Sequence, residues 1–284
     1  MQALFQPMKI IDAHVHFVDL ERPEGVVWPP SDSPYFSNFM PTDLVAEVAD
    51  IELAGCVLVE TSSRHSDNEW MLQFYVEEPL VLGEVANLDP VSKHFTDRLQ
   101  RLAPRLGFKG LRLRPIEQYD LRSESLVDAL SQLGDYKKTI ELGATTTERL
   151  RQYARLAQTV PGATCILDHM GHPRINGGKP PAGWLAAIKE FAANENAYCK
   201  VSGLMSHAQG HERSQELDCY RPTLAALMDE FGQDRLLFGS NWPPARSAGT
   251  YPQVLGLLAK FFGLQGVLVR DKFFAENARR VYQL

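Results

Sequence analysis

Two histidines, His14 and His16, stand one residue apart in an apolar segment near the start of the sequence. Alternate residues of a β-strand point to the same face, so this spacing aims both imidazoles at one place. Neutral imidazoles bind metal ions and polarise carbonyl groups, which makes the pair a candidate reaction centre. Asp12 shares the even spacing but lies deeper in the predicted strand, where we expect it to support the histidines.

Two arginines, Arg112 and Arg114, repeat this spacing in a later apolar segment. The planar guanidinium group binds carboxylates through paired hydrogen bonds, so we expect one or both arginines to hold an anionic or polyhydroxylated substrate. An ion pair with Glu60 or Glu84, two acids inside apolar segments, is the alternative. We also include Glu60 among the predicted substrate contacts, because it ends a predicted strand.

Three further side chains follow strand-like segments closely enough to reach the same place. Trp242 and Trp28 carry flat rings that stack on a sugar or lactone ring, although ordinary packing explains either tryptophan equally well. His65 is a weaker candidate for a substrate contact, because polar loop histidines are often only solvated. Ser240 does not lie in a Gly-x-Ser-x-Gly turn, so a serine nucleophile is not expected.

The elements that must position these residues recur along the chain. Short apolar segments rich in β-branched residues alternate with longer stretches of helical period. Parallel strands joined by right-handed helical crossovers close into a barrel when the unit occurs eight times. We therefore predict a single (β/α)8 TIM barrel over residues 1–284, with a doubly wound open sheet as the alternative. The predicted strands are Lys9–Phe17, Cys56–Thr61, Leu80–Asn87, Phe108–Arg114, Thr139–Gly143, Thr164–His169, Ala197–Ser202 and Arg235–Ser240.

Helical periodicity is clear at Thr42–Ala54 and Glu148–Thr159, which are predicted to be surface helices over the sheet. Long insertions at Asp19–Met40 and His207–Asp218 follow the first and seventh predicted strands. Extended loops at the carboxyl ends of barrel strands usually carry substrate contacts. The last helix, Asp271–Tyr282, is predicted to be the eighth barrel helix or an extra helix that closes the ring.

Five motifs, in order along nearly the whole chain, carry a resemblance to a known family. They are D-x-H-x-H at 12–16, LDHMGHP at 167–173, KVSGL at 200–204, FGS-x-WP at 238–243 and ENARRVY at 276–282. Together they resemble the amidohydrolase-2 family, and within it the lactonase-like branch of sugar-acid lactonases and 2-pyrone-4,6-dicarboxylate lactonase. The resemblance implies a barrel hydrolase in which His14, His16 and His169 line the centre, with the residue after Ser240 as the general base.

The sequence departs from the family pattern at two places. Family members usually have aspartate in FGSDWP, whereas this sequence has Asn241. A carboxamide takes no proton from water and is a weaker metal ligand, and losing a positioned base costs about 10²–10⁴ in rate. The strand-five segment, Lys138–Gly143, also lacks the histidine that metal-dependent relatives often place there.

Because of these departures, the sequence does not decide whether a metal ion is bound or which group is the general base. The ligands that remain for one divalent ion, zinc first, are His14, His16 and His169, with the Asn241 oxygen. Some lactonases of this branch work without metal, using histidines and arginines to polarise the ester carbonyl. If Asn241 is not the base, the base is a hydroxide made by a metal or one of four side chains. Those four are His169, Glu60, Glu84 and Glu141.

Composition and charge argue against some classes of binding partner. With 29 basic and 35 acidic residues the formal charge is −6, which argues against sequence-independent binding to nucleic acid. No run of about 18 apolar residues and no secretory leader appears, so neither membrane insertion nor secretion is expected. Four widely spaced cysteines without a CxxC pair indicate free thiols in a reducing cytoplasm. The expected partner is a small-molecule substrate, and a homo-oligomer is left open.

Three functions compete on this basis. The first is hydrolysis of a lactone, from a sugar acid or an aromatic-degradation product, by water attack on a carbonyl polarised by the histidines. The second is metal-dependent, non-oxidative decarboxylation, which other members of the family perform and which Asn241 disfavours. The third is a barrel that has lost catalysis and only binds a small ligand. Asn241 supports this last hypothesis, and the retained histidine motifs oppose it.

Overall fold

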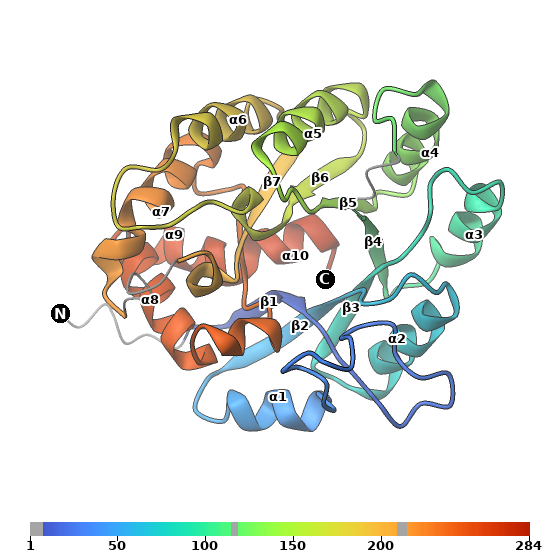
Figure 1. The fold of residues 1–284 in the computed structure, drawn as a ribbon, viewed down its shortest axis with the longest axis horizontal. Helices are drawn as coiled ribbons and strands as arrows, with labels where there is room; N and C mark the ends of the chain where they lie inside the picture. The colour runs from blue at the N-terminus through green and yellow to red at the C-terminus, as the bar shows by residue number, and fades with distance from the viewer. Residues whose placement is uncertain (1–7, 115–118, 209–214) are drawn as a thin grey trace.

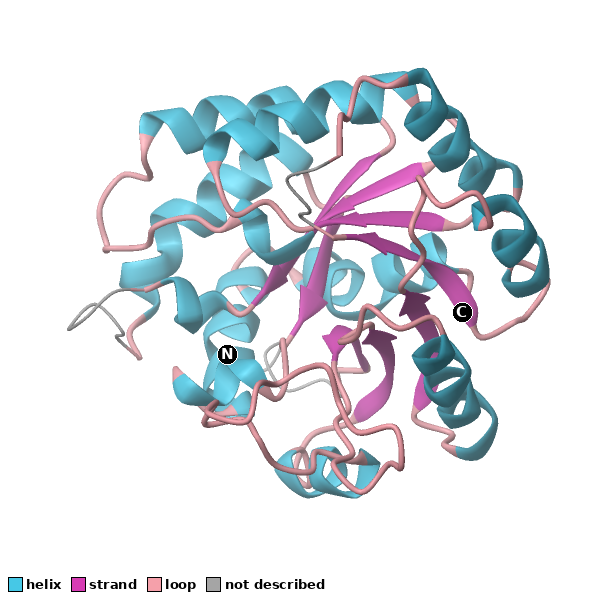
Figure 2. Ribbon diagram, turned by 45° about the vertical axis from the view of Figure 1, so that its right-hand side comes forward, coloured by secondary structure: helices cyan, strands magenta, loops and turns pink. Residues whose placement is uncertain are grey.

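A computed structural model describes residues 8–114, 119–208 and 215–284. Its strands form one sheet in which every neighbouring pair is parallel and the spatial order follows the chain order (Figure 2). The strands are β1 (Ile10–Val15), β2 (Leu53–Val59), β3 (Val81–Ala86), β4 (Phe108–Leu113), β5 (Thr139–Leu142), β6 (Thr164–Leu167), β7 (Ala197–Ser202) and β8 (Leu236–Gly239). The predicted (β/α)8 barrel is confirmed.

Helices follow the strands and cover the outside of the sheet (Figure 1). Their inner faces are apolar, as α5 shows with buried Leu150, Tyr153 and Leu156 over the sheet. The helices are α1 (Pro41–Glu47), α2 (Ser66–Glu77), α3 (Phe95–Leu102), α4 (Glu124–Asp135), α5 (Thr147–Thr159), α6 (Ala182–Ala192), α7 (Leu217–Phe231), α8 (Tyr251–Gly263), α9 (Val267–Asp271) and α10 (Asn277–Tyr282).

The first and last strands meet at their carboxyl ends and close the barrel. An isolated parallel bridge joins Val15 to Trp242, and the Asn241 N–H donates to the carbonyl of His14 at 3.0 Å. The β1–β2 register shifts between Asp12 and Val15, so three steps along β1 match two along β2. Such a bulge re-aims side chains, and here it lies between Asp12 and His14.

The barrel interior is closed at the amino end of the strands by the last segment of the chain. A π-helical turn at Lys272–Glu276 leads into α10, and both contact β1 and β8. Apolar side chains of this segment pack against inward-facing strand residues in one buried cluster. The cluster contains Ile11, Ala13, Val57, Val59, Val85, Ile166, Leu237, Ala275, Ala278, Val281 and Tyr282.

Two predicted helices differ from the structure. The predicted helix Thr42–Ala54 is too long, because α1 ends at Glu47 and Leu53 already belongs to β2. Apolar residues of the turn and of the following strand continued the helical spacing by coincidence. The predicted helix Asp271–Tyr282 is not a member of the outer ring. The eighth barrel helix is α8, and the last segment instead lies under the barrel.

The long loop predicted after the first strand is present. It runs from β1 to α1 and crosses α2, where Arg22 pairs with Asp67 at 2.7 Å and lies over the ring of Trp70 (Figure 1). The predicted insertion His207–Asp218 lies partly outside the described residues. Within the described ranges, no helix is long and apolar enough to cross a membrane. Cys56, Cys165 and Cys199 are buried free thiols.

Candidate active site

Three histidines gather at the carboxyl end of the strands. The ring centroid of His14 lies 4.9 Å from that of His16 and 4.5 Å from that of His169. The two β1 histidines are brought together with His169, which follows β6, because the carboxyl ends of all eight strands share one face of the barrel. The three are 0%, 5% and 7% exposed. Burial lowers the pKa of each, so all three are neutral imidazoles at pH 7.

His169 sits on an unusual left-handed turn. The φ angles of His169, Met170, Gly171 and His172 are 51°, 58°, 65° and 53°, a conformation that non-glycine residues rarely adopt. The turn is held from two sides: the His169 N–H donates to Ser202 Oγ, and the Trp184 indole N–H donates to the Met170 carbonyl at 2.9 Å. Strained backbone of this kind persists where its surroundings determine it, typically at functional sites.

The tautomer of His16 follows from its contacts. Its Nδ1 lies 2.9 Å from the carbonyl oxygen of Val59, which accepts hydrogen bonds but has no proton to give. The Nδ1 nitrogen of His16 therefore carries the proton, and Nε2 has the lone pair. The Asn241 side chain hydrogen-bonds the same ring, and burial lowers the His16 pKa to about 4.

Asp168 is a buried carboxylate beside these rings. Its Oδ2 lies 2.9 Å from Arg112 Nε, and its Oδ1 lies 3.4 Å from His14 Nδ1 and 3.6 Å from Lys200 Nζ. Burial opposes the ionisation of Asp168, but His14, Lys200 and Arg112 together hold its pKa well below the usual value. Asp168 is therefore an anion inside the barrel.

Lys200 links Asp168 to a second buried acid. Its Nζ lies 2.6 Å from Glu141 Oε2, and the Tyr282 hydroxyl donates to Glu141 Oε1 at 2.5 Å. Lys200 Nζ also lies 3.4 Å from His14 Nδ1. Lys200, Glu141 and Asp168 are all fully buried, and burial raises the Glu141 pKa to about 7 despite Lys200. A continuous polar network thus runs from α10 to the histidines.

The two predicted substrate-binding arginines lie at the edge of this network. Arg112 pairs with Asp168 and lies 3.9 Å from Glu60, and Arg114 hydrogen-bonds Glu60. The ion pair with Glu60, given as the alternative for these arginines, is confirmed. Glu60 is 3% exposed, so it holds the guanidinium groups rather than offering an oxygen to a ligand. The arginines themselves remain 20% and 29% exposed.

Some sequence candidates lie elsewhere. Trp242 is 2% exposed and packs edge-on against Phe17 and Phe39, which is the packing alternative given for it. The Nε2 atom of His65 contacts Arg98, and no contact brings His65 to the three histidines in the described residues. Glu84 is buried, and the charged groups acting on it are Arg105 and Glu69 of the outer layer. Glu84 is therefore not the base.

Asp12 supports the site from behind, as its depth predicted, but not from the same face as the histidines. Its Oδ1 accepts from the backbone N–H groups of His14 and Ser240, at 3.1 and 2.9 Å. The side chain also faces Tyr251 of α8, on the outer side of the sheet. The β1 bulge separates the two orientations, and Asp12 ties the first strand to the last.

Loop residues extend the histidine cluster outward. His172 and His207 lie with ring centroids 4.8 Å apart, and His172 is 5.4 Å from His169. Trp28, from the long first loop, has its ring 5.9 Å from that of His16. These three side chains border the mouth above the neutral histidines. His211, a weaker candidate on sequence, lies outside the described residues.

A divalent ion has a candidate donor set here that differs from the predicted one. Ligand atoms of His14, Asp168 and His169 all lie within 4.8 Å of one another, while His16 is not part of that group. In a tetrahedral zinc site nitrogen and oxygen ligands lie about 3.4 Å apart, so these donors would have to approach one another to share one ion. His14 Nε2 is buried without a hydrogen-bond partner among the described residues, which also suits a ligand.

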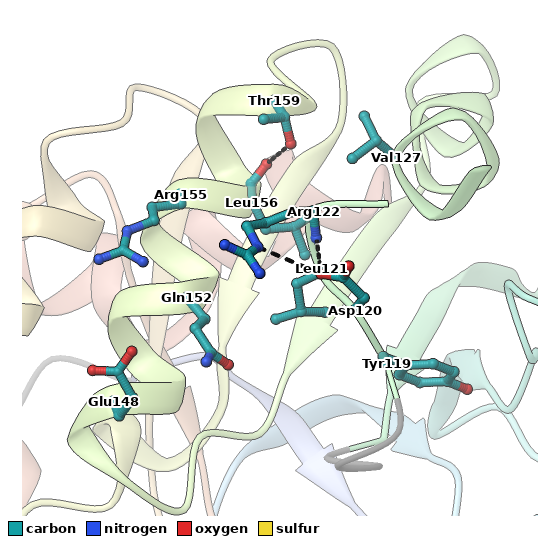
Figure 3. Close-up of a pocket in the computed structure, with 10 residues that line it drawn as sticks. All are labelled: Tyr119, Asp120, Leu121, Arg122, Val127, Glu148, Gln152, Arg155, Leu156 and Thr159. Carbon is teal, nitrogen blue, oxygen red and sulfur yellow. Dashed lines mark hydrogen bonds and ion pairs between the residues drawn. The ribbon is translucent and has the colours of Figure 1, made fainter. Parts of the chain in front are cut away.

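A separate cavity of about 350 Å³ lies away from the histidines, between α5 and the segment before α4 (Figure 3). Charged side chains of both signs line it, including Asp120, Arg122, Glu148 and Arg155. The lining contains neither a histidine nor a cluster of like charges. Size alone therefore does not mark this cavity as the reaction site.

Sequence reasoning missed three members of the network: Asp168 as a ligand, Lys200 and Tyr282. A signal existed for the first two, because Asp168 directly precedes His169 and a lysine inside an apolar strand is rarely buried unless paired. Tyr282 gave no such signal. Its contact with Glu141 joins residues 141 positions apart, which neither spacing nor periodicity encodes.

Two of the proteins similar in sequence are named L-fucono-1,5-lactonases. The chain is 29% identical over 287 residues to an L-fucono-1,5-lactonase of Burkholderia ambifaria, covering 96% of this chain and 95% of that relative. An L-fucono-1,5-lactonase of Burkholderia multivorans is 35% identical over 126 residues, which is 42% of this chain and 43% of that relative.

Solved structures show the same fold. An amidohydrolase from Burkholderia multivorans with bound zinc is 21% identical, has a TM-score of 0.82 and covers 97% of this chain and 99% of its own. A Pseudomonas putida protein described as a 2-pyrone-4,6-dicarboxylic acid hydrolase is 20% identical, with a TM-score of 0.76 and 98% coverage of both chains. The amidohydrolase family model (Amidohydro_2) matches residues 11–284, and the chain therefore belongs to the amidohydrolase family.

Proposed function

We propose that this protein is a lactonase that opens the ring of a sugar-acid lactone by water attack. The observation that carries the proposal is the cluster of neutral, buried His14, His16 and His169 beside two partly exposed arginines. Such a site offers imidazoles for proton transfer and cations for a developing oxyanion. The similarity to L-fucono-1,5-lactonases over 96% of the chain supports a hydroxyl-rich lactone.

His169 is the general base in this proposal. Glu60 is held by two arginines, Glu141 lies deep against Lys200 and Tyr282, and Asn241 has no basic group. His169 is neutral and, at 7%, the most exposed of the three histidines, with its Nδ1 2.8 Å from Ser202 Oγ. Its other nitrogen is left for a water molecule positioned by the neighbouring rings.

His14 polarises the substrate carbonyl in the same proposal. In this proposal Nδ1 of the neutral His14 ring accepts from Lys200 Nζ, 3.4 Å away, and the ring proton is on Nε2. That buried N–H, which has no partner among the described residues, is a donor for the carbonyl oxygen. Arg112 adds a positive charge to stabilise the oxyanion of the tetrahedral intermediate.

A divalent ion, zinc first, would be held by His14, Asp168 and His169. Bound there, it would act as a Lewis acid on the carbonyl. The partner is a small-molecule substrate, and the free cysteines suit the reducing cytoplasm that we propose as its location.

A lactone panel tests the proposal. Purified protein is assayed on sugar-acid 1,4- and 1,5-lactones by acid release with a pH indicator. We expect turnover of at least one lactone and a loss of about 10²–10⁴ in rate for His169→Gln, because a positioned base is removed. The rate of the His14→Ala variant should fall by at least the same factor.

The matched control is His94→Gln, an exposed histidine at the start of α3. This variant should keep the wild-type rate. A folded protein that turns over no lactone on the panel contradicts the function. A His169→Gln variant with the full rate contradicts the assignment of the base.

A further inference from the structure

A fully buried lysine occupies the middle of the candidate centre. Lys200 Nζ lies 2.6 Å from Glu141 Oε2, 3.6 Å from Asp168 Oδ1 and 3.4 Å from His14 Nδ1. Lysine is rarely buried unless its charge is paired, and these contacts account for its burial here. Its ammonium group is a compact positive charge, and all three contacts lie within 3.6 Å of it.

Two of the three candidate metal ligands therefore already contact a cation. Asp168 has Lys200 beside Oδ1 and Arg112 beside Oδ2, so both of its oxygens face positive charge. An ion bound among His14, Asp168 and His169 would lie within a few ångströms of the ammonium group. Repulsion between like charges is strong where water is excluded, so Lys200 opposes the ion directly.

Lys200 also lies beside the ring nitrogen that would orient His14 toward a metal. A histidine that binds a metal ion usually donates its other ring N–H to a carboxylate or carbonyl. For His14 bound through Nε2, that donor would be Nδ1–H toward Asp168. Lys200 Nζ and Asp168 Oδ1 each lie 3.4 Å from His14 Nδ1, so the ammonium group competes with this hydrogen bond. Binding through Nδ1 would bring the ion against the ammonium group itself.

We propose that Lys200 is a resident cation of this centre and holds the affinity for divalent metal low. It neutralises Asp168 and lies against Nδ1 of His14, so a positive charge already stands beside two of the candidate ligands. The inference uses the ligand set of the proposed function. Metal affinity is measured without substrate, so the inference and the lactonase proposal fail separately.

The direct test is Lys200→Met, which removes the charge and keeps the chain length. Zn²⁺ affinity is measured by competition with a chromogenic chelator, and Co²⁺ binding by visible absorption. We expect Zn²⁺ to bind about 10–100-fold more tightly than to wild type, the range by which neighbours of a ligand alter affinity. Adding His14→Ala to Lys200→Met should abolish this gain, because a ligand is lost.

The matched control is Lys109→Met. Lys109 is also a buried strand lysine, but its ammonium group contacts the Gln283 carbonyl at the opposite end of the barrel. The Lys109→Met variant should bind Zn²⁺ with the same affinity as the wild type. If Lys200→Met binds Zn²⁺ no more tightly than wild type, the proposal is overturned.

A second variant keeps the lysine and removes its counter-ion. Glu141→Gln retains an acceptor for Lys200 but leaves the ammonium charge facing Asp168 alone. We expect Zn²⁺ binding about tenfold weaker than in wild type, opposite in sign to Lys200→Met. This variant tests the inference even if Lys200→Met does not fold. Affinity that is unchanged or raised in Glu141→Gln overturns the proposal.

Discussion

At the scale of single residues, Asn241 explains how the site works without the family aspartate. The residue has φ of 60°, a left-handed conformation that asparagine tolerates well, and its N–H bonds the His14 carbonyl. Its side chain bonds the His16 ring, whose proton is committed to Val59. The carboxamide therefore contacts a neutral imidazole, and in the proposed mechanism the proton-transfer role falls to His169.

Asn241→Asp should raise the pKa of His16. In the wild type His16 stays neutral until the pH falls to about 4, because burial and Arg112 disfavour the imidazolium while Asp168 weakly favours it. A carboxylate at the same place stabilises the protonated ring, so the pKa should move up to about 5 or higher. Asparagine and aspartate both tolerate the positive φ of position 241, so the substitution should not disturb the backbone.

Histidine Cε1–H signals followed by NMR over pH 3 to 8 measure this change. The His16 signal is identified as the one that disappears in His16→Gln. His94, which is exposed, serves as the internal reference within the same spectra. A His16 midpoint that is equal or lower in Asn241→Asp than in the wild type would contradict the assigned contact.

At the scale of elements, the turn after β6 decides where His169 and His172 point. Four successive residues with positive φ form a left-handed turn, and Leu150 of α5 packs against its glycine. A Cβ added to Gly171, where φ is +65°, would lie 3.0 Å from Leu150 Cδ2. Glycine is thus needed at this position for both backbone and packing reasons.

Gly171→Ala should destabilise the fold and slow the reaction. A left-handed conformation costs a non-glycine residue about 1–2 kcal/mol, and the crowding against Leu150 adds to this. A backbone shift that relieves this strain also moves His169. The kcat of the variant should therefore fall more than its loss of stability explains. Urea unfolding and lactone turnover measure the two effects.

Gly256→Ala is the comparison for that variant. Gly256 lies within α8 and a Cβ there would meet nothing within 4 Å. Alanine favours helix over glycine by about 0.5–1 kcal/mol, so this variant should be equally or more stable. If Gly171→Ala matches Gly256→Ala in stability and rate, the turn is not the constraint described here.

Periodicity and spacing predict the elements of this chain better than their ends. The eight strands and the positions of His14, His16 and His169 follow from alternation and from apolar runs that end in polar residues. The β1 bulge, which separates Asp12 from His14, depends on pairing with β2 and leaves no mark in the spacing. The packing of Trp242 was left open for a similar reason, since Phe17 and Phe39 bury it from distant segments.

At the scale of the whole molecule, one network crosses the barrel from end to end. Tyr282 of α10 bonds Glu141, Glu141 pairs with Lys200, and Lys200 contacts His14 and Asp168 at the opposite end. Inward-facing apolar residues surround this network and exclude water from it. The segment that closes the barrel floor is thereby connected to the reactive end.

Tyr282→Phe should destabilise the protein while leaving the fold intact. The substitution removes the hydroxyl that bonds Glu141 and leaves one buried carboxylate oxygen without its donor. Such a loss costs about 1–3 kcal/mol. The denaturation midpoint in urea should fall accordingly, whereas the exposed Tyr136 changed to Phe should leave it unchanged. Equal midpoints for Tyr282→Phe and wild type would show that the bond contributes no stability.

The closure of β1 onto β8 has a consequence for the order of folding. The Ser240 N–H bonds Asp12 across a sequence separation of 228 residues, and Asn241 bonds His14 across nearly the same span. Contacts between such distant segments form late, because the loop between them must first be ordered. The histidines of the first strand are therefore completed into a working centre only in the final folding step. Partly folded chains expose His14 and His16 without the groups that control them, and during refolding catalytic activity should return after secondary structure.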